Sequence, residues 1–197
     1  MKSLKGTKTA ENLMKSFAGE GQANMRYTFF ASVAKKEGYV QISNIFLETA
    51  GNEVQHAKRF YKFLKEDFPN DEEIEITSAK YPVSLHGDTK ANLKAAAMGE
   101  HEEYSDLYLH FAEVARKEGF DQIATVFERV ADVEKHHEAR YKKLLANLEN
   151  GEVFKKKEAV LWKCGNCGYI FAGEQAPEKC PACAHPQAYF ELLAENY

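Results

Sequence analysis

The sequence has no long apolar run, no cluster of positive charge beyond the short run of Lys155, Lys156 and Lys157, and no cysteine before residue 164. No stretch approaches the length of a membrane span, and the first residues, MKSLKGTKTAEN, have no apolar core of the kind that a signal peptide needs. The net charge is −4, with both signs interspersed, and phosphate binding requires clustered positive charge. We therefore expect a soluble cytoplasmic protein with neither a nucleic acid nor a membrane as its partner.

The chain of 197 residues is long enough for one domain with a substantial core and a small second module. Gly38 and Gly119 each separate two long stretches of helical periodicity, and Pro69 and Pro82 mark the connection in the middle. The predicted helices cover residues 9–36, 40–67, 89–117 and 121–148. At about 1.5 Å per residue each would span roughly 40 Å, which suits a four-helix bundle.

Near Gly151 the pattern changes, and the following residues are of the type that forms strands. We predict an all-α bundle over residues 1–150, a linker over 151–158 and a β-rich module over 159–197.

The two helix pairs are copies of one another. VAKKEGYVQISNIFLETAGNEVQH (33–56) aligns with VARKEGFDQIATVFERVADVEKHH (114–137), so that Glu53 and His56 match Glu134 and His137. Upstream, AGEGQANMRYTFFA resembles MGEHEEYSDLYLHFA, which matches Glu20 with Glu100 but leaves one extra residue in the second copy. Each copy therefore contributes one glutamate and one Glu-x-x-His pair, whose members share a helix face.

Charged side chains interrupt the apolar stripe of every predicted helix at a similar level. In the third helix the stripe is expected to continue from Glu103 through Leu107, His110 and Val114. The interrupting residues are Glu20, Glu53, His56, Glu100, Glu103, Glu134 and His137. A single such residue is often an edge residue that reaches water or a hydrogen-bonded core residue. The duplicated set instead matches the ligand pattern of carboxylate-bridged dimetal bundles, in which cations offset the cost of buried charge.

The residue types favour iron or manganese, and bridging glutamates can hold two ions close together. Glu103 has no acidic counterpart in the first copy, where Ala23 stands, so the two metal positions are expected to differ and one ion could change ligands with oxidation state. His101, His110 and His136 fall beside or away from this level, and the surface is the favoured place for His136.

All of the cysteines lie in two pairs, Cys164-Gly-Asn-Cys167 and Cys180-Pro-Ala-Cys183. This spacing predicts a single tetrahedral metal ion rather than disulfides, and a structural zinc remains an alternative to iron. The motif CGNCGY resembles a rubredoxin, although the spacing between the pairs is shorter and Ala184 stands where rubredoxins usually carry glycine. The surrounding aromatic residues are Trp162, Tyr169, Phe171 and Phe190.

Together, these motifs make nearly the whole chain resemble the rubrerythrin family, in which a ferritin-like diiron bundle precedes a rubredoxin-like tail. The resemblance implies a non-haem peroxidase that reduces hydrogen peroxide to water and protects cells from oxidative stress. Its electrons would come ultimately from NAD(P)H through a separate reductase or a rubredoxin, and the iron of the tail would pass them to the diiron pair. It also implies a homodimer or higher homo-oligomer in which the tail of one subunit approaches the diiron site of another.

The resemblance also assigns roles to the residues. Glu53 and Glu134 would bridge two irons, with Glu20 and Glu103 on one iron and Glu100 and His137 on the other. His56 would replace Glu103 when the site is reduced. Tyr27 matches a family tyrosine that could hydrogen-bond a ligand, with an ordinary core tyrosine as the alternative. Cys164, Cys167, Cys180 and Cys183 would hold the third iron.

Two other functions stay open at this point. The bundle alone would permit ferritin-like iron oxidation and storage, although a storage protein has no evident need of the electron inlet that the tail would provide. A metal-binding adaptor with a zinc ribbon would leave the buried carboxylates without a redox role.

Overall fold

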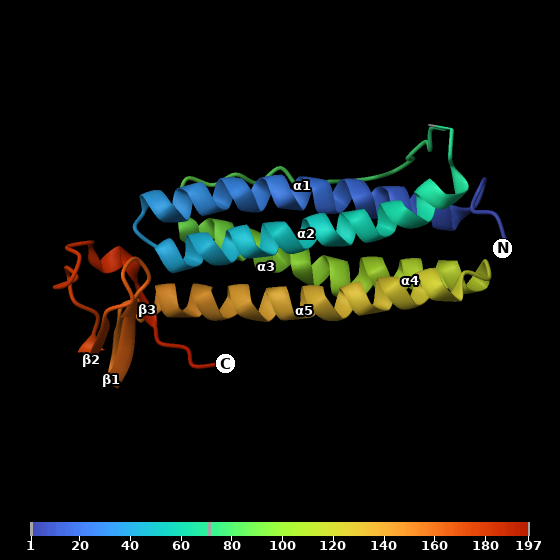
Figure 1. Cartoon of the computed structure of the whole chain (residues 1–197). Helices are drawn as coiled ribbons and strands as arrows, with labels where there is room; N and C mark the ends of the chain where they lie inside the picture. Colours follow the sequence, from blue (N-terminus) through green and yellow to red (C-terminus); the bar gives the residue numbers. More distant parts are fainter. Residues whose placement is uncertain (1, 71, 197) are drawn as a thin grey trace.

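The computed structural model describes residues 2–70 and 72–196 as a long helical bundle with a small sheet at one end (Figure 1). The helices are α1 (Lys8–Lys36), α2 (Val40–Asp67), α3 (Thr89–Glu102), α4 (Tyr108–Lys117) and α5 (Asp121–Glu149). A π-helical turn, η1 (Glu103–Leu107), joins α3 to α4, so that these segments form one continuous rod. The predicted four-helix bundle is confirmed.

Local chemistry explains where the helices begin and end. The side chain of Thr7 accepts a hydrogen bond from the backbone N–H of Ala10 at the start of α1, and Asp88 caps α3 in the same way through Ala91. Gly38 and Gly119 have φ angles of +86° and +80° just after α1 and α4, a conformation that glycine adopts without strain. Each glycine therefore allows the chain to turn back into an antiparallel neighbour.

The core of the bundle consists of two apolar clusters with a polar level between them. One cluster is built around Phe60 and Phe127, and the other, nearer the tail, around Phe46 and Tyr141. All four of these rings are fully buried. The bundle can therefore bury a large apolar area on both sides of the charged residues.

The π-helical turn corrects one prediction. Beyond Glu103 the buried residues of this rod, the third of the bundle, are Tyr108, Phe111, Ala112 and Ala115, whereas the predicted stripe ran through Leu107, His110 and Val114. A π-helical turn inserts one residue into an α-helix and moves everything after it by one position. The extra residue that distinguishes the second copy of the repeat is therefore accommodated here, beside Glu103.

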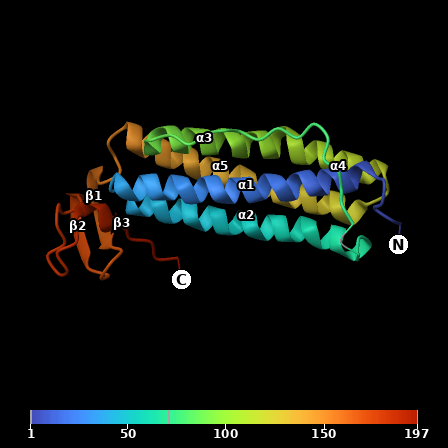
Figure 2. The same cartoon turned by 90° about the horizontal axis from the view of Figure 1, so that it is seen from above.

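The connection between α2 and α3 runs back along the outside of the bundle over α1 and the third rod (Figures 1 and 2). We call residues 77–85 of this connection the strap. The hydroxyl of Tyr81 donates a hydrogen bond of 3.1 Å to the backbone carbonyl of Lys15, and the Thr77 hydroxyl donates one of 3.0 Å to Glu11. These bonds hold the strap against α1.

The tail is a three-stranded antiparallel sheet with the order β2-β1-β3. Its strands are β1 (Lys155–Cys164), β2 (Ile170–Gln175) and β3 (Phe190–Leu192), and a short 3-10 turn, η2 (Gln187–Tyr189), precedes β3. Trp162 and Phe190 form its buried centre, and the indole N–H of Trp162 donates to the carbonyl of Gly173 at 2.9 Å. β1 begins inside the predicted linker 151–158, and the three domain boundaries remain a prediction.

The tail packs against the end of the bundle where α1 meets α2 (Figure 2). The ring of Tyr39 stacks on that of Phe154, with centroids 6.2 Å apart and an interplanar angle of 10°. In residues 2–70 and 72–196, none of the helices combines the length and the apolar character that crossing a bilayer requires.

Candidate metal centres

The predicted ligands meet at the polar level of the bundle, and helices α1, α2, α3 and α5 each contribute one glutamate. Glu20 comes from α1, Glu53 from α2, Glu100 from α3 and Glu134 from α5, and their exposed fractions are 0–1 %. Each occupies a core-facing position that the helical repeat would otherwise give to an apolar side chain.

The ligand atoms fall into two overlapping groups, each within 4.8 Å. The first contains Glu20, Glu53, His56 and Glu134, and the second contains Glu53, Glu100, Glu134 and His137. Glu53 and Glu134 belong to both groups, which is the position that bridging carboxylates take between two ions.

The histidines lie close to the shared carboxylates. His56 Nδ1 is 2.9 Å from an oxygen of Glu53 and 2.9 Å from one of Glu134. His137 Nδ1 is 2.8 Å from Glu134 and 3.3 Å from Glu53. The Glu-x-x-His spacing on α2 and α5 therefore places one nitrogen and one carboxylate of each helix at the same point.

The hydrogen bonding of the cluster is incomplete in a way that a cation would satisfy. Both carboxylate oxygens of Glu53 and Glu134 and the Nδ1 atoms of both histidines are buried without a hydrogen-bond partner. One oxygen each of Glu20 and Glu100 is in the same condition. Buried polar atoms are normally paired, so short distances without hydrogen bonds indicate lone pairs directed at shared ions. The residues present thus fit two metal ions.

The electrostatics support the same conclusion. Burial, together with the charges of Glu134 and Glu53, raises the pKa of Glu20 well above its usual value. Burial and the neighbouring carboxylates also raise the pKa of Glu100 to about 8. Burial alone would lower the pKa of His137, but the adjacent carboxylates raise it to about 12. Without a cation the cluster must therefore retain protons to reduce its negative charge.

Two tyrosines support the cluster in a symmetric arrangement. The hydroxyl of Tyr27 on α1 donates a hydrogen bond of 2.6 Å to Glu100 of the third rod. The hydroxyl of Tyr108 on α4 donates one to Glu20 of α1. Each copy of the repeat thus orients the glutamate of the other, and both tyrosines are 1 % exposed. Tyr27 thus hydrogen-bonds a predicted metal ligand, and its role in catalysis remains a prediction.

Sequence reasoning missed Tyr108, although the signal was present. Once the extra residue of the second copy is placed in η1, the repeat aligns Tyr108 with Tyr27. An uninterrupted helical period instead put Leu107 on the core stripe.

Glu103 lies in η1, beside the cluster but in neither ligand group. Its pKa is raised well above the usual value by burial and by the charges of Glu100 and Glu134. The structure thus brings His56 into the first group and leaves Glu103 next to it, so the predicted ligand role of Glu103 remains a prediction. His101, His110 and His136 are exposed, as was favoured for His136.

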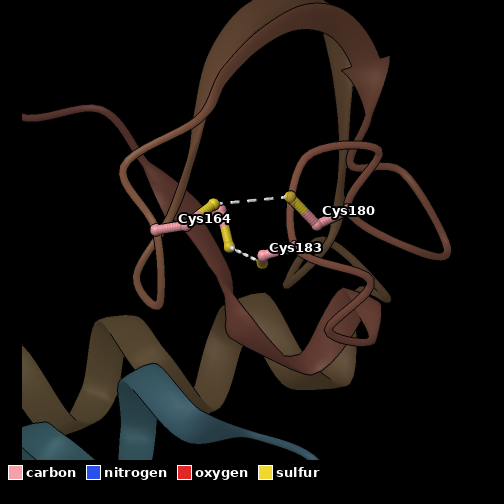
Figure 3. Close-up of side chains that lie close together, drawn as sticks. Cys164, Cys180 and Cys183 are labelled. Atoms are coloured by element: carbon pink, nitrogen blue, oxygen red, sulfur yellow. Dashed lines mark hydrogen bonds between the residues drawn. The ribbon is translucent and has the colours of Figure 1, made fainter.

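The second centre lies in the tail. The sulfurs of Cys164 and Cys183 are 3.8 Å apart, and those of Cys167 and Cys180 are 3.7 Å apart. Figure 3 shows the labelled side chains, Cys164, Cys180 and Cys183, turned toward a common point between two loops. All four are free thiols, and such spacing is too long for a disulfide but suits four thiolates around one tetrahedral ion.

The two cysteine loops have the same backbone design. The N–H of Cys164 donates to the carbonyl of Tyr169, and the N–H of Cys180 donates to that of His185, both at 2.8 Å. The residue after the second cysteine of each pair adopts a positive φ, +80° at Gly168 and +61° at Ala184. Ala184 therefore occupies the position where a glycine was expected, and it adopts the left-handed conformation despite its side chain.

A ferritin-like bundle that carries a dimetal carboxylate cluster, followed by a rubredoxin-like four-cysteine module, defines a class of two-centre iron proteins. A model of the family described as Rubrerythrin matches residues 11–145, and one described as Rubrerythrin, rubredoxin-like domain, matches residues 162–191. The chain belongs to the rubrerythrin family. It therefore has a diiron site in the bundle and a rubredoxin-like iron site in the tail.

Similar proteins span the same length. A protein named rubrerythrin from Clostridium perfringens is 65 % identical over 197 residues, which is 100 % of both chains. A rubrerythrin from Nitratidesulfovibrio vulgaris is 50 % identical, again over 100 % of both. A solved structure of nigerythrin in a partially reduced state has a TM-score of 0.64 at 31 % identity and covers 97 % of this chain and 92 % of its own.

Proposed function

We propose that the protein is a non-haem diiron peroxidase that reduces hydrogen peroxide to water and thereby protects the cell from oxidative stress. The observation that carries this proposal is the presence, on one chain, of a carboxylate cluster suited to two irons and a four-cysteine site suited to one. When bound, two irons would supply the two electrons that cleave an O–O bond. The four-cysteine site would restore them one electron at a time.

The residues of the cluster would bind and position these irons. Glu53 and Glu134 would bridge them, and Tyr27 and Tyr108 would keep Glu100 and Glu20 in a fixed orientation through their hydrogen bonds. His56 and Glu103 would act as alternative ligands of the first iron, because His56 joins that group while Glu103 lies beside it. The assignments of Glu103, His56 and Tyr27 to catalysis are part of this proposal.

We further propose that the protein works as a homodimer or higher homo-oligomer. Glu20 lies sixteen residues before the end of α1, which is about 24 Å at 1.5 Å per residue. The tail lies beyond that end (Figure 1), so its iron is far from the cluster of its own chain. The tail of a second subunit could approach more closely, while a separate rubredoxin or NAD(P)H-dependent reductase would supply the electrons.

An exposed apolar face on α1 and α2 supports self-association. Its residues recur at spacings that place them on one side of each helix, and the rings of Phe17 and Tyr61 join the two helices at a distance of 4.8 Å. Contiguous exposed apolar patches commonly mark protein contacts. The face comprises Phe17, Met25, Phe29, Leu47, Val54 and Tyr61, which are 37–58 % exposed.

A stopped-flow experiment tests the peroxidase proposal. The iron-loaded protein is reduced without oxygen and mixed with hydrogen peroxide or with oxygen, and the visible absorption of the four-cysteine iron is followed. We expect this band to return much faster with peroxide. A slow return would favour ferritin-like iron oxidation and storage, and an oxidised protein without the band would indicate zinc in the tail.

Replacement of Glu103 by alanine tests the ligand exchange. We expect Glu103→Ala to impair peroxide turnover while most of the iron binding survives, because the two ligand groups do not contain Glu103. Asp106→Ala is the matched control, since Asp106 is an exposed acid on the same π-helical turn. An equal loss of turnover and iron binding in Glu103→Ala would contradict the exchange.

A further inference from the structure

A cavity of about 370 Å³ lies between α1, the strap and the π-helical turn. Tyr81 and Pro82 of the strap form its outer wall, and Gly19 of α1 lines one side. Glu103 and Tyr108 line it next to the metal cluster, where Tyr108 hydrogen-bonds Glu20. The cavity thus extends from the surface under the strap to side chains in direct contact with the cluster.

A buried arginine forms part of the same wall. Arg26 is 9 % exposed, and its Nε donates to Gln22 at 2.7 Å while one Nη donates to Ser84 of the strap at 3.2 Å. Within residues 2–70 and 72–196 it forms no ion pair with a carboxylate. Its guanidinium carbon lies 5.7 Å from the ring centroid of Tyr27, and the side chain lines the cavity together with Glu103.

The chemistry of the lining limits what can pass. Arg26, Gln22 and the Tyr81 hydroxyl offer hydrogen-bonding groups, whereas Leu107 and Phe111 make the opposite side apolar. Such a lining suits a small polar molecule that can shed its water. A comparable cavity at the far end of the bundle, beside Leu4 and Phe63, has no residue of the cluster in its wall.

We propose that the cavity under the strap is the path by which the oxidant, a small, uncharged molecule with an O–O bond, reaches the diiron cluster. Arg26 is the positioning residue that keeps the path open, because it links α1 to the strap at Ser84 and lies against α3 beside Gly99. The proposal rests on the proposed function only for the identity of the oxidant.

Gly19 offers a way to block the path without touching a ligand. A methyl group built on Gly19 would meet only the ring of Tyr81, at 3.8 Å, so a larger side chain would extend into the cavity. We expect Gly19→Leu to slow both binding and release of azide at the diferric site on the order of tenfold, because a leucine side chain would fill part of the cavity that leads to Glu103 and Tyr108 and close-packed walls yield little. The dissociation constant should stay the same, since both rates fall together.

The measurement is stopped-flow absorbance of azide binding to the iron-loaded, oxidised full-length protein, with release followed after dilution. Gly19→Ala is the size control and should reproduce little of the slowing. Tyr81→Ala removes part of the outer wall and should raise both rates instead, with Leu85→Ala as a strap control that lies outside the cavity lining. If Gly19→Leu does not fold, the pair Tyr81→Ala and Leu85→Ala decides the question.

Unchanged rates in both Gly19→Leu and Tyr81→Ala would overturn the proposal. A change in only one of the two rates would also overturn it. The dissociation constant would then change, which would indicate a distorted site rather than a blocked path. Azide binding requires no turnover, so the outcomes can be separated from those for the function. If azide rates respond but peroxide is a poor oxidant, the path stands and the peroxidase proposal fails. If peroxide reacts rapidly but azide rates do not respond, only the path fails.

Discussion

In the bundle, the metal-binding side chains come from helices that are far apart in the sequence, whereas in the tail all four cysteines come from two short loops. The bundle cluster lies between two apolar cores and interrupts a structure that is already well packed. The tail has one small core, and Cys164 and Cys180 are themselves part of it. We therefore expect the bundle to fold without its metal ions, whereas the tail should need its metal ion to fold.

The largest expected difference between the two centres appears when one metal ligand is replaced at each. We expect Cys180→Ala to unfold the tail, because a structural metal contributes its binding free energy to folding in modules with little core, on the order of 10 kcal/mol in small zinc domains. Glu100→Gln should instead leave the bundle folded, since it replaces a buried carboxylate of raised pKa with a neutral side chain.

Hydrogen exchange measured by mass spectrometry, segment by segment, checks this contrast. In Cys180→Ala, β1 and β2 should lose protection while α1 and α5 keep theirs. In Glu100→Gln, protection should persist in both parts. Loss of protection in the bundle of Glu100→Gln would show that the cluster is as necessary to its fold as the cysteines are to theirs.

The contrast also explains what could be predicted from the sequence. Helical periodicity, the internal repeat and the two cysteine pairs are local patterns, and they predicted the bundle, the tail and the residues of both ligand groups. The π-helical turn could not be read from a constant period, and it moved Tyr108 to the core in place of Leu107. The cavity beneath Tyr81 was also not predictable, because the strap has no periodic pattern and its position depends on tertiary contacts.

A smaller effect should appear in the pH dependence of the metal-free protein. The pKa of Glu100 is raised to about 8, that of His56 to about 9 and that of His137 to about 12. Between pH 5 and 8 the folded chain thus holds protons that these groups lose on unfolding. Because the folded state binds more protons, its stability must fall as pH rises through this range.

We expect the Tm of the metal-free bundle to be higher at pH 5.5 than at pH 8 on the order of 5 °C, given the Tm change per kcal/mol for a domain of this size. Iron replaces the protons, so the loaded bundle should lose most of this dependence and binding should release protons. Calorimetry of both forms at the two pH values checks the prediction. A metal-free Tm that rises with pH would contradict the proton-holding cluster.

The smallest expected effect concerns the two cysteine loops, which differ at one position. Gly168→Ala places a side chain at a φ of +80° and should destabilise the tail by about 1 kcal/mol, the usual cost of the left-handed conformation. Ala184→Gly removes that cost at the other loop but gives the unfolded chain more freedom, which offsets about 0.5–1 kcal/mol. Its net gain should therefore be smaller than the loss in Gly168→Ala.

Guanidinium unfolding followed by the absorbance of the tail's iron measures both changes. A control at Gly151, which has a φ of +66° after α5 and lies outside the cysteine loops, should shift the bundle rather than this absorbance when replaced by alanine. If Ala184→Gly stabilised the tail as much as Gly168→Ala weakened it, backbone strain at Ala184 would be a larger part of the tail's energetics than its φ of +61° implies. The iron would then be holding one loop against its local preference, which would make the tail depend on its metal still more strongly.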